Sequence, residues 1–198
     1  KIASYTGEKR GPLLICLGGI HGNEWAGVKA IDLMGKMLEV EPITNPEFSY
    51  SGRFIGLIGN LEALKKNRRF LDADLNRSFH DITMQRIQTL PAEELNSEER
   101  EIAELFEMIN AEIEDYNPEL TVVLDLHTTT AGGGIFVLTT DDPESIRIGV
   151  ELHAPVITGF LNGVEGTTMH FFTPDRFDRK MITVVFEGGQ HDELLSVN

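Results

Sequence analysis

The 198-residue sequence has one cysteine and lacks any apolar run long enough to cross a membrane. A single cysteine cannot form an internal disulfide, and because Cys16 lies inside a short apolar run we expect it to be a small core residue. A membrane helix needs roughly 18 apolar residues or more in succession, so no membrane partner is expected. These features predict a protein of a reducing compartment, the cytoplasm.

Basic residues are also scarce, because 17 Lys and Arg face 32 Asp and Glu and give a formal net charge of -15. Such a charge repels phosphates and argues against nucleic acid as a partner. The 41% hydrophobic and 25% charged residues are ordinary for a folded protein. Length and the lack of internal repeats predict one domain over residues 1–198 with a sizeable core.

Hydrophobic patterning predicts an α/β fold. Short apolar runs predict buried strands at residues 13–19, 53–60, 121–127, 134–140 and 181–187. Apolar residues at three- and four-residue intervals predict a helix over residues 25–38 and another around residues 102–113, whose acidic side we expect only to be solvated. The polar segment 81–101 contains a proline and predicts a surface excursion. Strands that alternate with helices favour a mixed central sheet flanked by helices.

The stretch "GGIHGNE" at residues 18–24 directly follows the first predicted strand. It reads either as a turn with polar residues facing water or as part of a metal site. His127 ends another predicted strand and Glu187 ends a third. Ligands in open α/β sheets gather outside the carboxyl ends of the strands, so these groups should converge on one edge. That convergence favours a metal site over a simple polar turn.

A catalytic zinc ion often takes two histidines and one carboxylate. His21 and Glu24 can reach one ion from a tight turn in which Gly22 gives the backbone freedom, and His127 completes the set. Asp125 lies on the same strand face as His127 and can orient a ligand. We therefore expect one Zn²⁺ per chain. Three further histidines, His80, His153 and His170, are expected to be surface or packing residues, whereas His191 is expected near the site.

One basic stretch, "LKKNRRFLDADLNRSF" at residues 64–79, stands out in this acidic chain. Lys65 and Lys66 are expected to be solvated. The residues Arg69, Asn76 and Arg77 lie among apolar residues that should hold them against the core. Guanidinium groups bind carboxylates and stabilise oxyanions, so the stretch predicts a small anionic substrate. Asp72 and Asp74 are expected to hold the arginines in place.

Four motifs taken together, "GGIHGNEWAG", "NLEALKKNRRFLDADLNRSF", "DLHTT" and "FEGGQH", resemble the succinylglutamate desuccinylase/aspartoacylase family, which is related to zinc carboxypeptidases. They occur in the family's order and span residues 18–191. The resemblance implies a zinc-carboxypeptidase-like fold. It also implies a zinc-dependent hydrolase that cleaves a small acidic N-acyl amino acid into a carboxylic acid and a free amino acid.

The resemblance further implies roles for individual residues. His21, Glu24 and His127 would bind zinc, and Glu187 would act as general base and acid. Arg69 would polarise the substrate carbonyl, Asp74 would support the site, and Asn76 and Arg77 would bind the substrate carboxylate. The family also uses an arginine shortly before the catalytic glutamate, for which Arg176 and Arg179 are the candidates.

The resemblance leaves several points open. Family members usually continue into a smaller β-rich domain, which we expect to be absent from this chain because it stops eleven residues after Glu187, so that the chain is either a fragment or a short member of the family. The motifs are compatible with an acetyl, a succinyl or another acyl group, and with an oligomer. A metallocarboxypeptidase that acts on peptide C-termini and a non-catalytic protein that binds an acidic metabolite are the alternative functions.

Overall fold

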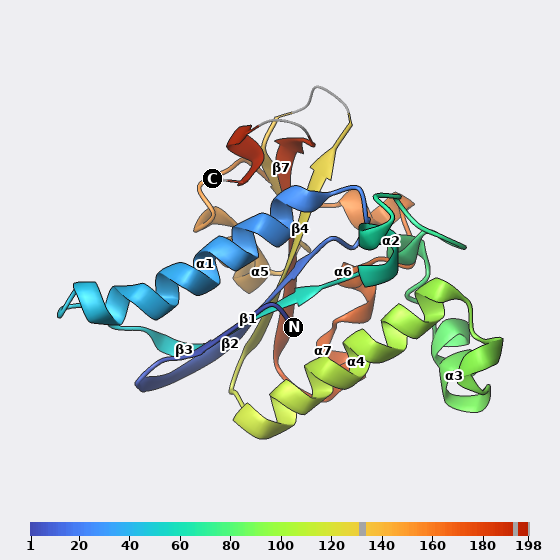
Figure 1. Cartoon of the computed structure of the whole chain (residues 1–198), viewed down its shortest axis with the longest axis horizontal. Coiled ribbons are helices and arrows are strands. Elements are labelled where there is room, and N and C mark those ends of the chain that lie inside the picture. The colour runs from blue at the N-terminus through green and yellow to red at the C-terminus, as the bar shows by residue number, and fades with distance from the viewer. Residues whose placement is uncertain (131–133, 192–193, 198) are drawn as a thin grey trace.

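A computed structural model describes residues 1–130, 134–191 and 194–197 and contains a seven-stranded mixed sheet in the order β1-β3-β2-β4-β7-β5-β6 (Figure 1). Strands β2, β3, β4 and β7 run parallel, β1 is antiparallel to β3, and β5 is antiparallel to β7. The strands are β1 (Ala3–Thr6), β2 (Lys9–Gly18), β3 (Ser51–Ile58), β4 (Thr121–Thr129), β5 (Phe136–Leu138), β6 (Val156–Ile157) and β7 (Met181–Gln190). The prediction of an α/β fold with a mixed central sheet is confirmed.

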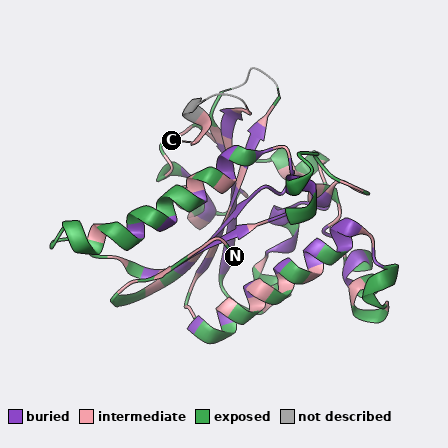
Figure 2. Ribbon diagram, viewed as in Figure 1, coloured by how far each residue is buried: buried purple, intermediate pink, exposed green. Residues whose placement is uncertain are grey.

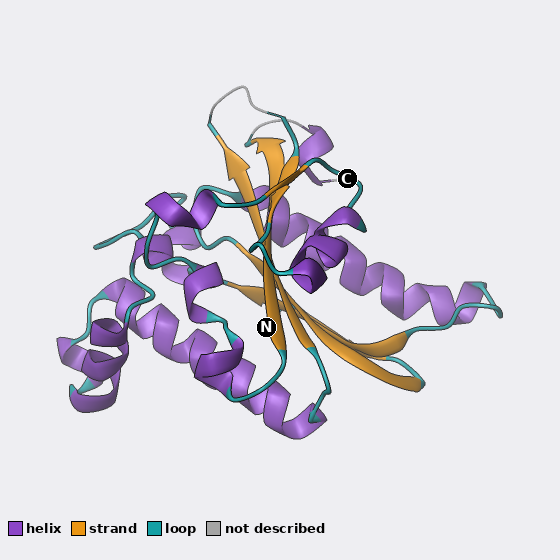
Figure 3. Ribbon diagram, turned by 180° about the vertical axis from the view of Figure 1, so that it is seen from behind, coloured by secondary structure: helices purple, strands orange, loops and turns teal. Residues whose placement is uncertain are grey.

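Helices cover both faces of the sheet, as the front and back views show (Figures 1 and 3). The α-helices are α1 (Trp25–Thr44), α2 (Leu61–Lys65), α3 (Asp81–Thr89), α4 (Ser97–Tyr116), α5 (Pro143–Val150), α6 (Thr168–Phe171) and α7 (Pro174–Phe177). The described residues also form the short 3-10 helices η1 (Leu75–Arg77), η2 (Ala92–Glu94), η3 (Phe160–Gly163) and η4 (Leu194–Val197). Within the described part of the chain, every helix is too short or too polar to cross a lipid bilayer.

Alternation along β2 divides the core between the two faces of the sheet. Leu13, Ile15 and Leu17 are fully buried in the cluster that contains the apolar side of α4. Cys16 points to the other face and packs in the cluster of Ile31 from α1. Burial raises the pKa of the Cys16 thiol to about 12, so it stays protonated. The buried positions follow the strands through the centre of the molecule (Figure 2).

Helix α1 lies close to the sheet because its packing side carries small residues. A Cβ atom on Gly35 would lie 2.7 Å from the Ala3 Cβ, and one on Gly27 would lie 2.8 Å from the Leu126 Cβ. The buried side of α1 therefore consists of glycines, Ala26, Ile31 and Leu38. Larger apolar residues of the predicted periodic pattern stay substantially exposed, namely Trp25, Leu33, Met34 and Met37.

Segment 81–101 lies largely at the surface as expected up to residue 94, but it contains helices that the pattern did not predict. Residues 81–89 form α3, whose Met84 packs into the main core, and α4 already begins at Ser97. The expectation that the acidic side of α4 is merely solvated is wrong. Glu98 is fully buried in its first turn, and near its end Glu112 lies 2.6 Å from Lys1 Nζ and 3.2 Å from an Arg53 nitrogen.

Candidate metal centre

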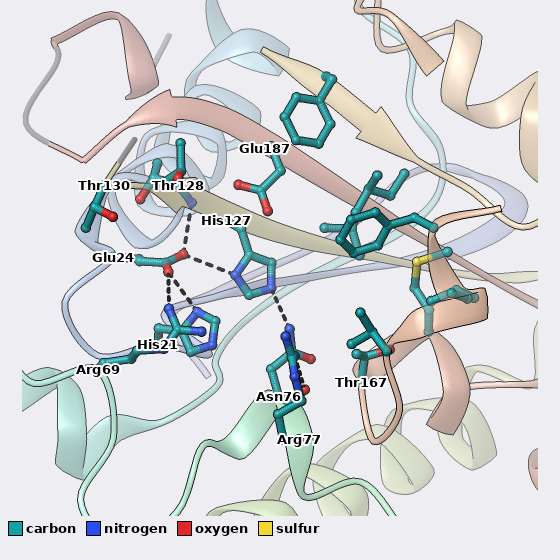
Figure 4. A pocket seen from close by; sticks show the side chains of 18 of the residues that line it. His21, Glu24, Arg69, Asn76, Arg77, His127, Thr128, Thr130, Thr167 and Glu187 are labelled. Atoms are coloured by element: carbon teal, nitrogen blue, oxygen red, sulfur yellow. Dashed lines mark hydrogen bonds and ion pairs between the residues drawn. The ribbon is translucent and has the colours of Figure 1, made fainter. Parts of the chain in front are cut away.

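The predicted site residues meet at the carboxyl ends of β2, β4 and β7. His21 and Glu24 lie in the turn between β2 and α1, His127 lies on β4, and Glu187 lies on β7. His127 and Glu187 are register partners of adjacent parallel strands, so both side chains leave the same face of the sheet. Figure 4 shows the four side chains gathered around one space. Pairing of the strands thus fixes the distance between the groups on β4 and β7.

Two glycines shape the turn that carries His21 and Glu24. Gly19 has a φ of +70°, a left-handed conformation that favours glycine. Gly22 was expected to supply backbone freedom, but the structure gives a different reason for glycine, which is lack of space. A Cβ at this position would lie 2.2 Å from the carbonyl carbon of Ala63. The Gly22 N–H also donates to the Arg69 carbonyl oxygen at 3.1 Å. The turn is therefore pressed directly against α2 and the basic loop.

The carboxylate of Glu24 lies between the two histidines. Its Oε1 is 2.7 Å from His21 Nδ1 and its Oε2 is 3.1 Å from His127 Nδ1. One donor atom from each of the three buried residues lies within 4.8 Å of the other two. Burial alone would raise the pKa of Glu24, but hydrogen bonds and charges from His127 and His21 outweigh it and lower the pKa far below its usual range.

The geometry of the His21, Glu24 and His127 donors fits a zinc ion. Two imidazole nitrogens and one ionised carboxylate are the ligands of many catalytic zinc sites, and all three residues here are buried and converge. The opposite ring nitrogens meet further carboxylates, since His21 Nε2 is 3.2 Å from Asp74 Oδ1 and His127 Nε2 is 2.8 Å from Asp125 Oδ2. Such partners fix the ring orientation of metal-binding histidines. Asp125 therefore lies beside His127 as predicted, where its carboxylate can orient the ring.

The same contacts shift the pKa values of His127 and Asp74. Burial would lower the pKa of His127, but the charge and hydrogen bond of Asp125, with those of Glu24, raise it well above its usual value. Burial would raise the pKa of Asp74, but His21 and Arg69 outweigh it and lower the pKa far below its usual range. Glu24 and Asp74, whose pKa values are both lowered, therefore remain ionised near neutral pH.

Glu187 is half-buried and faces the same space. Burial raises the pKa of its carboxyl group, and the charges of Glu24 and Asp125 raise it further, against opposing contributions from His127 and His21. Its Oε2 is buried and has no hydrogen-bond partner in the described part of the chain. A carboxylate with a raised pKa and an unused oxygen is suited to exchange a proton with a bound molecule.

The basic loop supplies the polar wall facing these groups. Arg69 donates to Asp74 Oδ2 from Nε at 3.2 Å and from Nη2 at 3.0 Å, and its Nη1 lies 3.8 Å from Glu24 Oε1. Asn76 Nδ2 lies 3.4 Å from His127 Nε2, and Asn76 Oδ1 accepts from the Thr168 N–H at 3.1 Å. Asp74 thus holds Arg69 as expected.

Asp72 does not hold an arginine in the structure. Its Oδ2 accepts instead from the Ser97 N–H at 2.8 Å, at the start of α4. Lys65 lies at the surface and bonds Glu62 at 2.7 Å, in line with the expectation that it is solvated.

Sequence reasoning missed Glu98, which organises this loop. Its Oε1 accepts from Asn60 Nδ2 at 3.1 Å and from the Leu71 N–H at 2.8 Å. Its Oε2 accepts from the backbone N–H groups of residues 72 and 73 at 3.0 and 3.1 Å. One buried carboxylate therefore satisfies three successive backbone donors just before Asp74. No local sequence pattern signals this, because the partners lie 25 to 38 positions away.

A cavity of about 360 Å³ opens between these residues. His191 lines it and its Nδ1 lies 2.7 Å from Thr128 Oγ1, which places it near the site as expected. The predicted metal, base and polar residues His21, Glu24, His127, Glu187, Arg69, Asn76 and Arg77 all line it. The other histidines, His80, His153 and His170, are not among its described lining residues.

Neither Arg176 nor Arg179 reaches this cavity in the structure. The Arg176 guanidinium bonds Asp81 and lies 4.5 Å from the centre of the Phe171 ring, and Arg179 Nη1 donates to Asn117 Oδ1 at 2.7 Å. Both residues precede β7, so they lie toward its amino end, whereas Glu187 lies near its carboxyl end. The ten-residue length of β7 separates them from the site.

These features define an α/β protein with a buried two-histidine, one-carboxylate metal-binding set. The family model described as "Succinylglutamate desuccinylase/Aspartoacylase catalytic domain" matches residues 10–184. The chain belongs to the succinylglutamate desuccinylase/aspartoacylase family, and its His21, Glu24 and His127 set is consistent with the zinc site typical of that family.

Individual relatives are distant. A "Probable aspartoacylase" of a Nostoc species is 29% identical over 133 residues, which cover 67% of this chain and 40% of the relative. A "Succinylglutamate desuccinylase" of Pseudomonas paraeruginosa is 33% identical over 67 residues, or 34% of this chain and 19% of the relative. The chain thus spans less than half the length of these relatives.

Solved structures agree on the fold. The crystal structure of the succinylglutamate desuccinylase from Chromobacterium violaceum matches with a TM-score of 0.68 and 18% identity, over 98% of this chain and 65% of that one. Murine aminoacylase 3 matches with a TM-score of 0.59 and 21% identity, over 90% of this chain and 56% of that one. At such identities these matches describe the fold.

Proposed function

We propose that this chain is a zinc-dependent hydrolase that cleaves the amide bond of an N-acyl amino acid to a carboxylic acid and a free amino acid. The observation that carries the proposal is the pairing of the His21, Glu24 and His127 donor set with Glu187 on the neighbouring strand. Membership of the family supports it. When bound to the three donors, zinc would supply a Lewis acid that polarises the amide carbonyl and acidifies water.

The chain's own residues would divide the remaining work. The substrate carboxylate would bind Asn76 and Arg77, which line the cavity beside His127. Arg69, oriented by Asp74, would donate to the carbonyl oxygen as negative charge develops on it. Binding at both ends would fix the position of the amide between these groups.

Glu187 would move the protons. It takes one proton from the attacking water as the hydroxyl oxygen bonds to the acyl carbon. It then gives that proton to the amide nitrogen as the carbon–nitrogen bond breaks, so that the amine leaves neutral. The raised pKa of Glu187 suits both directions of transfer, because the group accepts and releases a proton nearer to neutral pH.

The test is Glu187→Gln in zinc-loaded protein, with release of free amine as the assay. We expect zinc content to stay unchanged and turnover to fall by about 10²- to 10⁴-fold, because the amide cannot exchange the proton. Glu151→Gln, at an exposed position outside the cavity, is the matched control and should retain full turnover. Near-normal turnover in Glu187→Gln would remove Glu187 from this role. A short peptide with a free C-terminus should be included, since hydrolysis of the peptide alone would point to a carboxypeptidase.

A further inference from the structure

The cavity has two unlike sides. One side holds the metal donors and the arginines described above. The other side, which we call the apolar wall, consists of Phe136, Leu138, Phe160, Leu161, Met169 and Val185. Three of these residues, Leu138, Met169 and Val185, form a buried hydrophobic cluster against which Phe136 and Leu161 pack. These five residues are therefore a preformed part of the core, and Phe160, which is half exposed, lies at the margin of the wall.

Asn76 and Arg77 lie between the metal donors and the apolar wall. Asn76 is 3.4 Å from His127 on one side and accepts from the Thr168 N–H, one residue before Met169, on the other. Figure 4 shows the same order, with Glu24 and His21 on one side, Asn76 and Arg77 in the middle, and Thr167 beyond them. With the amide directed to the metal donors, a carboxylate held by Asn76 and Arg77 would leave the apolar wall as the side of the cavity open to the substituent on its α-carbon.

Among the described residues that line the cavity, the possible cations besides the metal donors are Arg69, Arg77 and His191. The His191 Nδ1 lies 2.7 Å from Thr128 Oγ1, beside the metal donors and away from the apolar wall. Arg69 is already engaged twice by Asp74. Among the described residues that line the cavity, Arg77 is the arginine whose guanidinium bonds no carboxylate, since its Nη1 donates to the Asn76 carbonyl oxygen. A second carboxylate on the substrate side chain that entered the apolar wall would meet no cation among the described wall residues, and an unpaired buried charge is costly.

We infer that the amino-acid half of the substrate carries one carboxylate and an apolar side chain, aliphatic or aromatic, and not the second carboxylate of aspartate or glutamate. The inference rests on the proposed function and narrows its substrate class. The product would be an amino acid such as leucine or phenylalanine. The α-carboxylate alone then supplies the negative charge that the basic stretch predicts for the substrate.

The first test compares substrates that differ only in the side chain. Zinc-loaded protein is assayed for free-amine release from N-acetyl-leucine, N-acetyl-phenylalanine and N-acetyl-aspartate. We expect kcat/KM for the apolar pair to exceed that for N-acetyl-aspartate by at least about tenfold, because apolar burial and the unpaired charge act in the same direction. A preference for N-acetyl-aspartate overturns the inference and leaves the proposed function standing.

A binding measurement distinguishes a failure of the inference from a failure of the proposed function. The same three compounds are titrated into zinc-loaded Glu187→Gln protein by calorimetry. Tighter binding of the apolar compounds by about tenfold supports the inference even if the wild-type chain turns none of them over, in which case the proposed function fails alone. Equal binding of all three, or no binding of any, overturns the inference.

A charge placed in the apolar wall should reverse the preference. Phe160 is half exposed on η3, so Phe160→Arg leaves the core intact and adds a cation where the second carboxylate would lie. We expect the ratio of kcat/KM for N-acetyl-phenylalanine over N-acetyl-aspartate to fall by about tenfold or more. Ile157→Arg is the matched control, since Ile157 is similarly exposed nearby on β6 and lies outside the cavity. An unchanged ratio in Phe160→Arg contradicts the placement of the side chain.

Discussion

Asp125 is a fully buried residue that contacts the candidate metal ligand His127 and is not among the described lining residues of the cavity. Its Oδ2 accepts from Thr168 Oγ1 at 2.7 Å and lies 2.8 Å from His127 Nε2. The carboxylate therefore holds the His127 ring with Nδ1 turned toward Glu24. Asp74 holds His21 in the same way from the basic loop. Ring orientation at this site is set by carboxylates from two separate parts of the chain.

We predict that Asp125→Asn weakens zinc binding by about ten- to a hundredfold, because the neutral amide is a weaker acceptor for the imidazole N–H. Competition against a chelator measures the change. Asp142→Asn serves as the control, since Asp142 caps α5 through the Ser145 N–H and should leave zinc affinity unchanged. An unaltered affinity in Asp125→Asn would show that Thr168 and packing alone orient the ring.

Glu98 gives a second prediction at the residue scale. In Glu98→Gln one of the two acceptor oxygens becomes an NH₂ group, which faces two donors that it cannot satisfy. We expect a loss of about 2 kcal/mol in the free energy of unfolding. We also expect a higher KM, with kcat and zinc content less affected, because the loop that carries Asn76 and Arg77 loosens. Urea titration and steady-state kinetics measure the two effects.

Glu101→Gln is the control for Glu98→Gln. Glu101 is a buried carboxylate of the same helix that accepts from the Glu62 N–H at 2.9 Å, on α2 and away from residues 71–73. This variant should leave KM unchanged. A KM that rises equally in both variants would mean that general destabilisation, and not the loop, is responsible.

Residue positions in the candidate site were predictable where they follow strands. His21, Glu24, His127 and Glu187 come directly after or at the end of apolar runs, and the parallel sheet brings those ends together. Glu98 was not predictable because three of its four partners are backbone N–H groups, which carry no signature in the sequence, and the fourth, Asn60, lies 38 positions away. The prediction that Asp72 holds an arginine is wrong because Asp72 accepts from the Ser97 N–H at the start of α4. The apolar pattern predicted that this helix begins several residues later.

At the scale of elements, strongly apolar segments were predicted to within a few residues. The runs at 121–127 and 181–187 correspond to β4 and β7, which extend only two and three residues further. α3 was missed because it has few apolar residues and Met84 is its main core contact. β1 was missed because it is a four-residue edge strand whose antiparallel partner, β3, lies far along the sequence. Pairing of this kind depends on the assembled sheet.

The first turn of α4 yields a prediction on pH. Glu99 accepts from Arg86 Nε at 2.5 Å and closes a capping box, in which Asn96 and Glu99 bind each other's backbone N–H groups. The hydrogen bond from Arg86 is the main reason that the pKa of Glu99 is lowered. A carboxylate with a lowered pKa stabilises the folded state above its unfolded pKa of about 4.3, and this stability is lost as pH falls through the folded pKa.

We therefore expect Glu99→Ala to cost about 1 kcal/mol of unfolding free energy at pH 7 and less as the pH is lowered below about 4. Urea unfolding followed at both pH values measures the difference. Glu107→Ala, at an exposed position later in the same helix, is the control and should show little effect. A cost for Glu99→Ala that grows toward acid pH would contradict the linkage.

At the scale of the whole molecule, the metal donors join separate parts of the chain. Glu24 and His21 follow β2, His127 lies about a hundred residues later on β4, and the two parts meet in the centre of the sheet. A ligand that binds only the folded arrangement stabilises it in proportion to its concentration over its Kd. Zinc binding should thus be visible as a change in global stability.

We predict that zinc at about one hundred times its Kd raises the unfolding free energy by about 2.7 kcal/mol. For a chain of about 200 residues this corresponds to a Tm higher by about 5–10 °C. Differential scanning calorimetry with and without chelator measures the shift. His21→Ala should show no zinc-dependent shift, whereas His153→Asn, outside the cavity, should behave as the wild type. A zinc-dependent shift retained in His21→Ala would place the ion elsewhere.

The apolar wall and the metal donors come largely from different segments. Most wall residues belong to β5, η3 and α6, and none of these elements carries a metal donor. In evolutionary terms, the wall can accumulate substitutions while selection on the chemistry keeps the opposite side of the cavity unchanged. If the chain is the proposed hydrolase, changes in the wall would alter the choice of substrate while the metal donors stay in place, and exchanging η3 alone would test this in the laboratory.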